Sequence, residues 1–426
     1  MTEIEHRSIC DGVSFRSVRD TRFKTMRIAV NFMLPLEKDQ TAANALLPFL
    51  LSRASREYPD FTKLGEKLSE LYGAELVADV QKMGDVQVLG ISAVGIADRY
   101  ALDGESISGE LSRLLCSVIF DPPFENGLFP EEGFRQEQRQ TIEMIDAEYN
   151  DKRTYARLRC EEIMCKEEPY GISRYGSRDD IVSMRRETLT DAWKHLMSRA
   201  RIEIMALGDC EPEPIFAGFR DAFCAVSRDY HAIGTGKAFS AGSEVKLFEE
   251  KMDVAQSKLV MGFRTGAESD EESMHTRLMT ALFGGTPHSK LFLNVREKLS
   301  LCYYCSARYN SHKGIILVES GVETENIERA REEILRQLEE VKNGNFDAEE
   351  LNSAKLSLCN NYRTIGDYLG ALENWYVSQV FHETIRTPEE AAECINGIAR
   401  EQVIQAARRV KLDTEYRLVG SGEVEK

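Results

Sequence analysis

The sequence predicts an α+β fold built from two copies of one unit, each a mostly antiparallel sheet with helices packed on it. Three pairs of matching segments support this prediction: a strand, a strand–turn–strand pattern and a closing helix–strand pattern. They recur in the same order in both halves of the 426-residue chain. A chain of this length has room for two domains, each with its own core.

The two strands lie 231 residues apart, at Met26–Phe32 and Ser257–Phe263. Apolar side chains alternate along both, which is typical of a strand with one buried face. At the same offset, GEKLS at residues 65–69 matches REKLS at residues 296–300. Each of these segments is followed by a strand–turn–strand pattern, with turn residues at 82–85 and 310–314.

A helix follows in each half, because apolar residues recur every three or four positions over residues 107–118 and 327–341. Each half then closes with a helix and a strand, at residues 187–209 and 401–423. We therefore predict an N-terminal domain over residues 1–226, a polar linker over 227–243 and a C-terminal domain over 244–426.

Composition restricts the partners and the compartment. A net charge of −17 argues against nucleic acid or an anionic membrane as a partner, since both attract basic surfaces. No apolar segment approaches the length of a membrane helix, and the first residues lack the apolar centre of a signal peptide. Ten scattered cysteines indicate a reduced, cytoplasmic protein.

Cys302 and Cys305 have C-x-x-C spacing within a predicted strand. Neighbouring side chains of a strand point to opposite faces, so we expect these two cysteines to face opposite ways. No second C-x-x-C is present to complete a zinc site. We therefore interpret both as structural cysteines.

Hydrolytic zinc sites commonly use two histidines one helical turn apart. No two of the seven histidines lie three to five residues apart, so neither H-E-x-x-H nor H-x-x-E-H occurs. Glycine-rich phosphate loops and the G-x-S-x-G elbow are also absent. An independent enzyme of another class therefore finds little support in the sequence.

A dense group of motif residues lies within Phe283–Tyr309. In order, they are Gly284, Gly285, Ser289, Leu291, Phe292, Arg296, Glu297, Lys298, Leu301 and Tyr303. This pattern resembles the second half of the insulinase/pitrilysin-type zinc peptidases (inverzincins), and the resemblance extends over residues 15–423. It implies the half-clamshell fold of that family.

In that family, an Arg and a Tyr seven residues apart bind the substrate backbone and support the tetrahedral intermediate. The resemblance assigns these roles to Arg296 and Tyr303, with Gly284 and Gly285 letting backbone approach backbone beside a bound peptide. A guanidinium and a phenol suit these roles, because both offer directed donors to a peptide oxygen. The alternative is that Arg296 forms a surface ion pair and Tyr303 packs at a domain boundary.

The first half departs from the family at its zinc motif. If Arg53-Ala54-Ser55 corresponds to the corner that follows H-x-x-E-H, residues 45–49 replace the motif. These residues are Ala45, Leu46, Leu47, Pro48 and Phe49. Apolar side chains cannot bind zinc, and Pro48 would kink a helix interior. The family's later glutamate ligand would fall near Glu143 and Met144. Because both histidines are missing, we interpret Glu143 as an exposed helix carboxylate.

The segment from Met164 to Gly176 is similar to the bacterial non-catalytic branch of the family, and some names in that branch link it to elongation factor P modification. The resemblance implies a chain that binds no zinc and cleaves no peptide alone. Its partner would be a homologous subunit bearing H-x-x-E-H and zinc, or a second copy of this chain, and its substrate a peptide or small protein. The alternative is a scaffold or peptide-binding protein of the same fold without any part in proteolysis.

Overall fold

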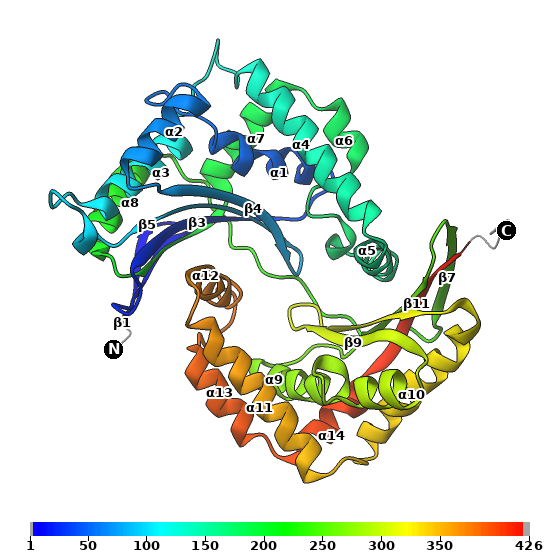
Figure 1. The fold of residues 1–426 in the computed structure, drawn as a ribbon. Coiled ribbons are helices and arrows are strands. Elements are labelled where there is room, and N and C mark those ends of the chain that lie inside the picture. The colour runs from blue at the N-terminus through cyan, green and yellow to red at the C-terminus, as the bar shows by residue number, and fades with distance from the viewer. Residues whose placement is uncertain (1–2, 421–426) are drawn as a thin grey trace. The chain divides into compact units, whose positions relative to one another are not determined.

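The computed structural model describes residues 3–420, which form two compact units, each with one mixed sheet (Figure 1). Unit 1 contains the chain up to Ile145, Ile172–Gly234 and Tyr368–Ser378. Unit 2 contains Asp146–Gly171, Thr235–Asp367 and the chain from Gln379 onward. Neither unit is one continuous stretch of the sequence. The predicted domains were continuous, because they followed the sequence repeats.

The sheet of unit 1 has the strand order β1-β2-β6-β3-β5-β4. All neighbouring strands are antiparallel except β2 and β6, which are parallel. Its strands are β1 (Glu3–Cys10), β2 (Val13–Arg19), β3 (Thr25–Pro35), β4 (Glu75–Met83), β5 (Val86–Ile96) and β6 (Arg201–Gly208).

The sheet of unit 2 has the order β7-β11-β8-β10-β9, with β7 and β11 as its parallel pair. Its strands are β7 (Lys246–Met252), β8 (Ser257–Arg264), β9 (Cys302–Asn310), β10 (Ile315–Val322) and β11 (Lys411–Gly420). This order repeats β2-β6-β3-β5-β4 of unit 1, with the parallel pair in the same place. The predicted fold, two copies of one α+β unit, is therefore confirmed.

Helices pack on one face of each sheet and cover its apolar residues. In unit 1, Ile28, Val30 and Phe32 of β3 join a core with residues of α1 and α3. The helices are α1 (Thr41–Leu51), α2 (Phe61–Glu70), α3 (Ile107–Phe120), α4 (Glu131–Asn150), α6 (Arg178–Ser183), α7 (Arg186–Arg199) and α8 (Pro212–Cys224). Short 3₁₀ turns are η1 (Asp98–Tyr100), η2 (Pro169–Gly171) and η5 (Thr324–Asn326).

The helices of unit 2 include two π-helical segments, η3 (Ala281–Gly285) and η4 (Leu291–Lys298), which lead into β9. The α-helices are α9 (Asp270–Thr280), α10 (Ile327–Lys342), α11 (Ala348–Ile365), α13 (Pro388–Gly397) and α14 (Arg400–Arg409). The predicted linker, residues 227–243, contains no helix or strand.

The opposite face of each sheet is covered by a helix that comes from the other half of the sequence. In unit 1 this helix is α12 (Leu369–Val377), which packs on β3 and β6. Its Glu373 carboxylate accepts hydrogen bonds from Arg27 and Asn31 on the polar face of β3. The sheet is therefore closed on both faces.

In unit 2 the corresponding helix is α5 (Lys152–Met164), which packs on β8 and β11. Ala156, Cys160 and Met164 form a small apolar core there with residues of β8, β10 and β11. Gly262 of β8 permits the close approach, because a Cβ at that position would lie 2.7 Å from the Met164 sulfur. The exchange of α5 and α12 explains why the compact units are discontinuous in sequence.

Candidate functional site

The helix on which the family resemblance placed the lost zinc motif, α1, is part of the core of unit 1. Ala45, Leu46 and Leu47 are fully buried, Pro48 is buried and Phe49 is partly buried against the same core. The Pro48 carbonyl accepts hydrogen bonds from both the backbone N–H and the hydroxyl of Ser52. The helix thus continues past the proline without a side chain that could bind a metal.

The second part of the expected metal site lies on α4. The Glu143 side chain is 68% exposed, and one of its oxygens lies 3.8 Å from Arg139 Nε. Met144 is partly buried against the core of unit 1. The buried carboxylate of this helix is instead Glu137, which receives a 2.7 Å hydrogen bond from Arg53 at the end of α1. Arg53 and Glu137 therefore join α1 to α4 through an ion pair.

Within residues 3–420, no three His, Cys, Asp or Glu side chains are grouped so that they could hold a metal ion. The residues at the expected site therefore do not fit zinc, since a zinc site needs at least three such donors. Over the same range, no helix has the length and apolar character needed to cross a membrane.

Arg296 and Tyr303 lie on neighbouring elements of unit 2, η4 and β9, which pack together. The Arg296 guanidinium is centred 4.6 Å from the Phe292 ring, and its Nε lies 3.6 Å from the adjacent Glu297 carboxylate. Its side chain is 40% exposed. Tyr303 is 63% exposed, and its hydroxyl donates a 2.8 Å hydrogen bond to Glu323. This hydrogen bond raises the pKa of Tyr303.

Gly284 and Gly285 end η3. Gly284 is buried, and a Cβ there would lie 2.7 Å from the Ala307 side chain and 2.9 Å from the Ala307 backbone nitrogen. A Cβ on Gly285 would lie 3.2 Å from the Thr280 carbonyl. Gly284 therefore lets η3 approach β9 of the same chain. The predicted approach of the two glycines to a bound peptide stays a prediction, because this contact lies inside the unit.

β9 is the edge strand of its sheet, since it pairs with β10 alone. Opposite Gly321 and Val322 of β10 lie Tyr304 and Cys302, so Tyr303 is the extra residue of a β-bulge. A bulge redirects the side chains of its strand. Gly321 makes room for this geometry, because a Cβ there would lie 2.4 Å from the Tyr304 ring.

The bulge corrects the prediction for the two cysteines of β9. Cys302 and Cys305 are both buried, with 8% and 4% of their surfaces exposed. The extra residue between them turns both side chains to the same face of the sheet, because their partners Val322 and Ser320 are two residues apart on β10. The prediction that they face opposite ways was wrong, because strict alternation fails at a bulge.

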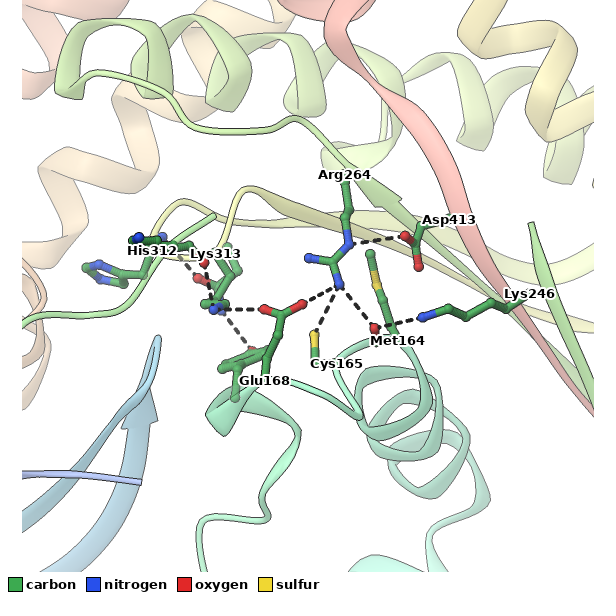
Figure 2. Close-up of polar contacts among 11 residues, drawn as sticks. Met164, Cys165, Glu168, Lys246, Arg264, His312, Lys313 and Asp413 are labelled. Atoms are coloured by element: carbon green, nitrogen blue, oxygen red, sulfur yellow. Dashed lines mark hydrogen bonds and ion pairs between the residues drawn. The ribbon is translucent and has the colours of Figure 1, made fainter. Parts of the chain in front are cut away.

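Figure 2 shows a buried ion cluster in unit 2 that the sequence analysis missed, made of Glu168, Arg264, Lys313 and Asp413 (here the Glu168 cluster). The Glu168 carboxylate lies 2.6 Å from Arg264 Nη2 and 2.9 Å from Lys313 Nζ. Arg264 Nε also contacts Asp413 at 3.2 Å. Lys313 has no exposed surface, and its Nζ donates to the carbonyl of Lys237.

The Glu168 cluster fixes the chain just after α5 to the sheet of unit 2. Arg264 Nη2 also donates to the carbonyl of Met164, the last residue of α5. Two carboxylates and two cations balance in charge, as buried ions must if their burial is to be tolerated. Local sequence patterns do not reveal this cluster, because its members are up to 245 residues apart (residues 168 and 413).

Two histidines also come together in unit 2. The rings of His312 and His382 meet edge to face with centroids 5.4 Å apart, and His382 Nδ1 lies 3.5 Å from Asp270. Burial lowers the pKa of His312 to about 3, and the charges of His382 and Arg277 add to this effect. His312 is therefore neutral in the folded protein at neutral pH.

Comparison with known proteins places these features in a family. Residues 183–358 match the family model described as "Peptidase M16 inactive domain". A protein of Bacillus subtilis (strain 168) named "Probable inactive metalloprotease YmfF" is 30% identical over 411 residues, which cover 96% of each chain. The chain belongs to the M16 peptidase family.

Other M16-like proteins agree with this assignment. A conserved protein from Enterococcus faecalis V583 has a similar structure, with a TM-score of 0.91 and 27% identity over 99% of this chain and 100% of that chain. An M16 inactive domain from Pseudomonas fluorescens has a TM-score of 0.78 at 15% identity, with 100% of both chains covered. The latter similarity is evidence for the M16 fold alone.

A protein of Rickettsia bellii (strain RML369-C) named "Uncharacterized zinc protease" is 23% identical over 297 residues, or 67% of this chain and 69% of that protein. The chain itself is an inactive M16 homologue. The family predicted from the motif at residues 283–309 is thereby confirmed, and the apolar α1 gives a physical reason for inactivity.

The Glu168 cluster leads to a prediction about stability. Glu168→Gln leaves the buried cations of Arg264 and Lys313 without their shared carboxylate, and breaking a buried pair costs about 3 kcal/mol or more. We expect a clearly lower midpoint in urea unfolding followed by circular dichroism. Glu167→Gln is the matched control, because Glu167 is an exposed neighbour. An equal midpoint for both variants would contradict the stabilising role of the cluster.

His312 leads to a prediction about pH. Its pKa is lowered in the folded chain, so the unfolded chain binds a proton below about pH 6.5 that the folded chain refuses. Stability should fall as the pH drops from 6.5 to 4.5, with His312 contributing about 2 kcal/mol of the loss. His312→Phe, which keeps a ring beside His382, should flatten the dependence, measured by urea unfolding at several pH values. His231→Gln, at an exposed position, should leave the pH dependence unchanged. Identical slopes for the two variants would refute the assignment of this pH dependence to His312.

Proposed function

We propose that this chain is the non-catalytic subunit of a heterodimeric zinc metallopeptidase. In this assembly, Arg296 and Tyr303 act on a peptide whose scissile bond is held at the zinc of an H-x-x-E-H-bearing partner. The observation that carries the proposal is the contrast between the two repeats. The first has an apolar, buried α1 in place of the metal motif, whereas the second keeps both polar side chains exposed beside an edge strand.

Arg296 is suited to bind an oxygen that gains negative charge. Its nearest carboxylate, Glu297, is an exposed neighbour at 3.6 Å, a type of pair that contributes little free energy. The guanidinium can therefore turn its donors to a peptide carbonyl or to the oxyanion of a tetrahedral intermediate without a large loss. The Phe292 ring under the guanidinium limits its orientations.

Tyr303 has one hydroxyl proton, which it donates to Glu323. While this hydrogen bond is present, the phenol oxygen can accept a hydrogen bond from a peptide N–H. To donate to a substrate oxygen, the hydroxyl must leave Glu323, and an exposed hydrogen bond costs about 1 kcal/mol to break. Glu323 thus holds the ring in place without fixing the proton permanently.

The edge strand supports peptide binding by the same unit. The outer backbone groups of β9 have no strand partner, and an extended peptide can pair with such an edge. Zinc in the partner would polarise the scissile carbonyl and activate water. This chain would contribute positioning and charge stabilisation, and we propose that it cleaves nothing alone.

A scaffold role is the second candidate. It is favoured by the local partners of both side chains, since Arg296 rests on Phe292 and Tyr303 donates a hydrogen bond to Glu323. A scaffold of this fold would assemble with its partner and contribute nothing to the rate of cleavage. Substitution of Arg296 separates the two roles.

The test is a mixing experiment with a homologous M16 protein from the same organism that bears H-x-x-E-H. We expect each protein alone to leave a fluorogenic peptide library uncleaved and the mixture to cleave it. Arg296→Ala should lower kcat/KM of the mixture by about 10²–10³-fold, the usual effect of removing one oxyanion donor. Tyr303→Phe should lower it less, because a shape-conserving change removes a single hydrogen bond.

Arg308→Ala is the matched control, since Arg308 is an exposed arginine on β9, the strand that carries Tyr303. It should leave the rate unchanged. Assembly of each mixture is checked by sedimentation, so that loss of binding is not mistaken for loss of turnover. Equal rates for Arg296→Ala and Arg308→Ala in assembled mixtures would support the scaffold and exclude the proposed role of Arg296.

A further inference from the structure

The register of β9 brings its two cysteines within reach of each other. Cys302 lies opposite Val322 and Cys305 opposite Ser320. These two partners are only two residues apart on β10, a distance of roughly 7 Å at about 3.4 Å per residue. In a regular strand, cysteines three residues apart would be separated by about 10 Å and face opposite sides. The bulge at Tyr303 shortens this separation and puts both cysteines on the same face of the sheet.

A disulfide joins Cα atoms about 4.4–6.8 Å apart. The separation set by the register of β9, roughly 7 Å, lies just above this range, so a small contraction of the bulge is sufficient. Both cysteines are reduced in the structure. Both thiols are buried, so reagents reach them by local opening of β9, an edge strand that pairs with β10 alone.

The pKa values of the two thiols are also shifted in opposite directions, which suits a reactive pair. The neighbouring Cys305 thiol lowers the pKa of Cys302, and the charge of Arg296 adds to this effect. The same contact raises the pKa of Cys305. Burial raises the pKa of Cys116 and of Cys210 to about 12. Cys302 is therefore favoured as the attacking thiolate, with Cys305 as the second thiol.

We propose that Cys302 and Cys305 form a reversible disulfide within β9 by exchange with small-molecule disulfides of the glutathione type. The Cys302 thiolate attacks one sulfur of the oxidant, which breaks its S–S bond and releases one thiolate. Cys305 then gives up its proton and attacks Cys302 Sγ, releasing the second thiolate. The two cysteines lose two electrons, the oxidant gains them, and the two thiol protons pass to the released thiolates.

The disulfide spans the bulge, so its closure reshapes the backbone that carries Tyr303. It also removes the Cys302 thiol, whose pKa the charge of Arg296 helps to lower. The functional consequence rests on the proposed function: oxidation of β9 alters the side chains that act on the peptide. The formation of the disulfide itself requires neither a partner nor peptide cleavage.

The test uses the isolated chain in mixtures of oxidised and reduced glutathione. After an acid quench, denaturation, alkylation and trypsin digestion, both cysteines lie in one peptide, residues 299–308, which has no other cysteine. We expect both alkyl groups to be lost together as the oxidised fraction rises, with the singly alkylated form below about a tenth of the total. Dithiothreitol should restore the doubly alkylated peptide.

Single substitutions separate the two steps. Cys305→Ala should stop the reaction at a glutathione adduct on Cys302, and Cys302→Ala should leave Cys305 largely unmodified. The exposed Cys394 serves as an internal control for the oxidant. A peptide that keeps both alkyl groups while Cys394 carries glutathione would overturn the proposal, as would the absence of an adduct on Cys302 in Cys305→Ala.

Hydrogen exchange measures the effect on the bulge. The amides of residues 299–308 should exchange at different rates in the oxidised and reduced chains, while the hairpin of β4 and β5 in unit 1 stays unchanged. Equal rates in residues 299–308 would contradict the reshaping of β9. Neither readout depends on proteolysis, so failure here is distinct from failure of the proposed subunit role.

Discussion

Burial of α1 without any metal-binding side chain is the constraint on which the functional account depends. Ala45, Leu46 and Leu47 are packed with no exposed surface against the sheet of unit 1. To regain zinc, this helix would need ligands and an open position for water, and both would disrupt a close-packed core. The first repeat thus keeps the fold of a peptidase half while α1 serves as core.

In the second repeat, by contrast, the candidate polar side chains are exposed. Three unusual backbone features occur close together in this repeat. They are the π-helical segments η3 and η4, the packing of Gly284 against β9, and the bulge at Tyr303. Bulges and π-helical segments are common near functional sites. Around this stretch, the Glu168 cluster and the exchanged helix α5 stabilise the sheet from its other face. The result is a rigid unit that presents a few exposed polar groups.

Sequence patterns predicted the fold because its repeats rest on local signals. Alternation marked β3 and β8, turn residues marked the hairpins, and stripes of apolar residues marked α3 and α10. The family motif identified Arg296 and Tyr303 as candidates. The bulge was missed, since one inserted residue leaves no compositional trace and reverses the faces of the residues beyond it. The Glu168 cluster, the His312–His382 pair and the exchange of α5 and α12 were missed because they arise from contacts between distant segments.

The central claim is that this chain has no zinc site of its own, and metal analysis tests it most directly. The purified chain is equilibrated with excess zinc, freed of unbound metal by gel filtration and analysed by mass spectrometry of the metal. The account predicts no stoichiometric zinc in the wild-type chain and no change in the double variant His312→Phe and His382→Phe. One zinc per chain, lost in that variant, would contradict it, because these two histidines would then be ligands of a site that the fold does not otherwise reveal.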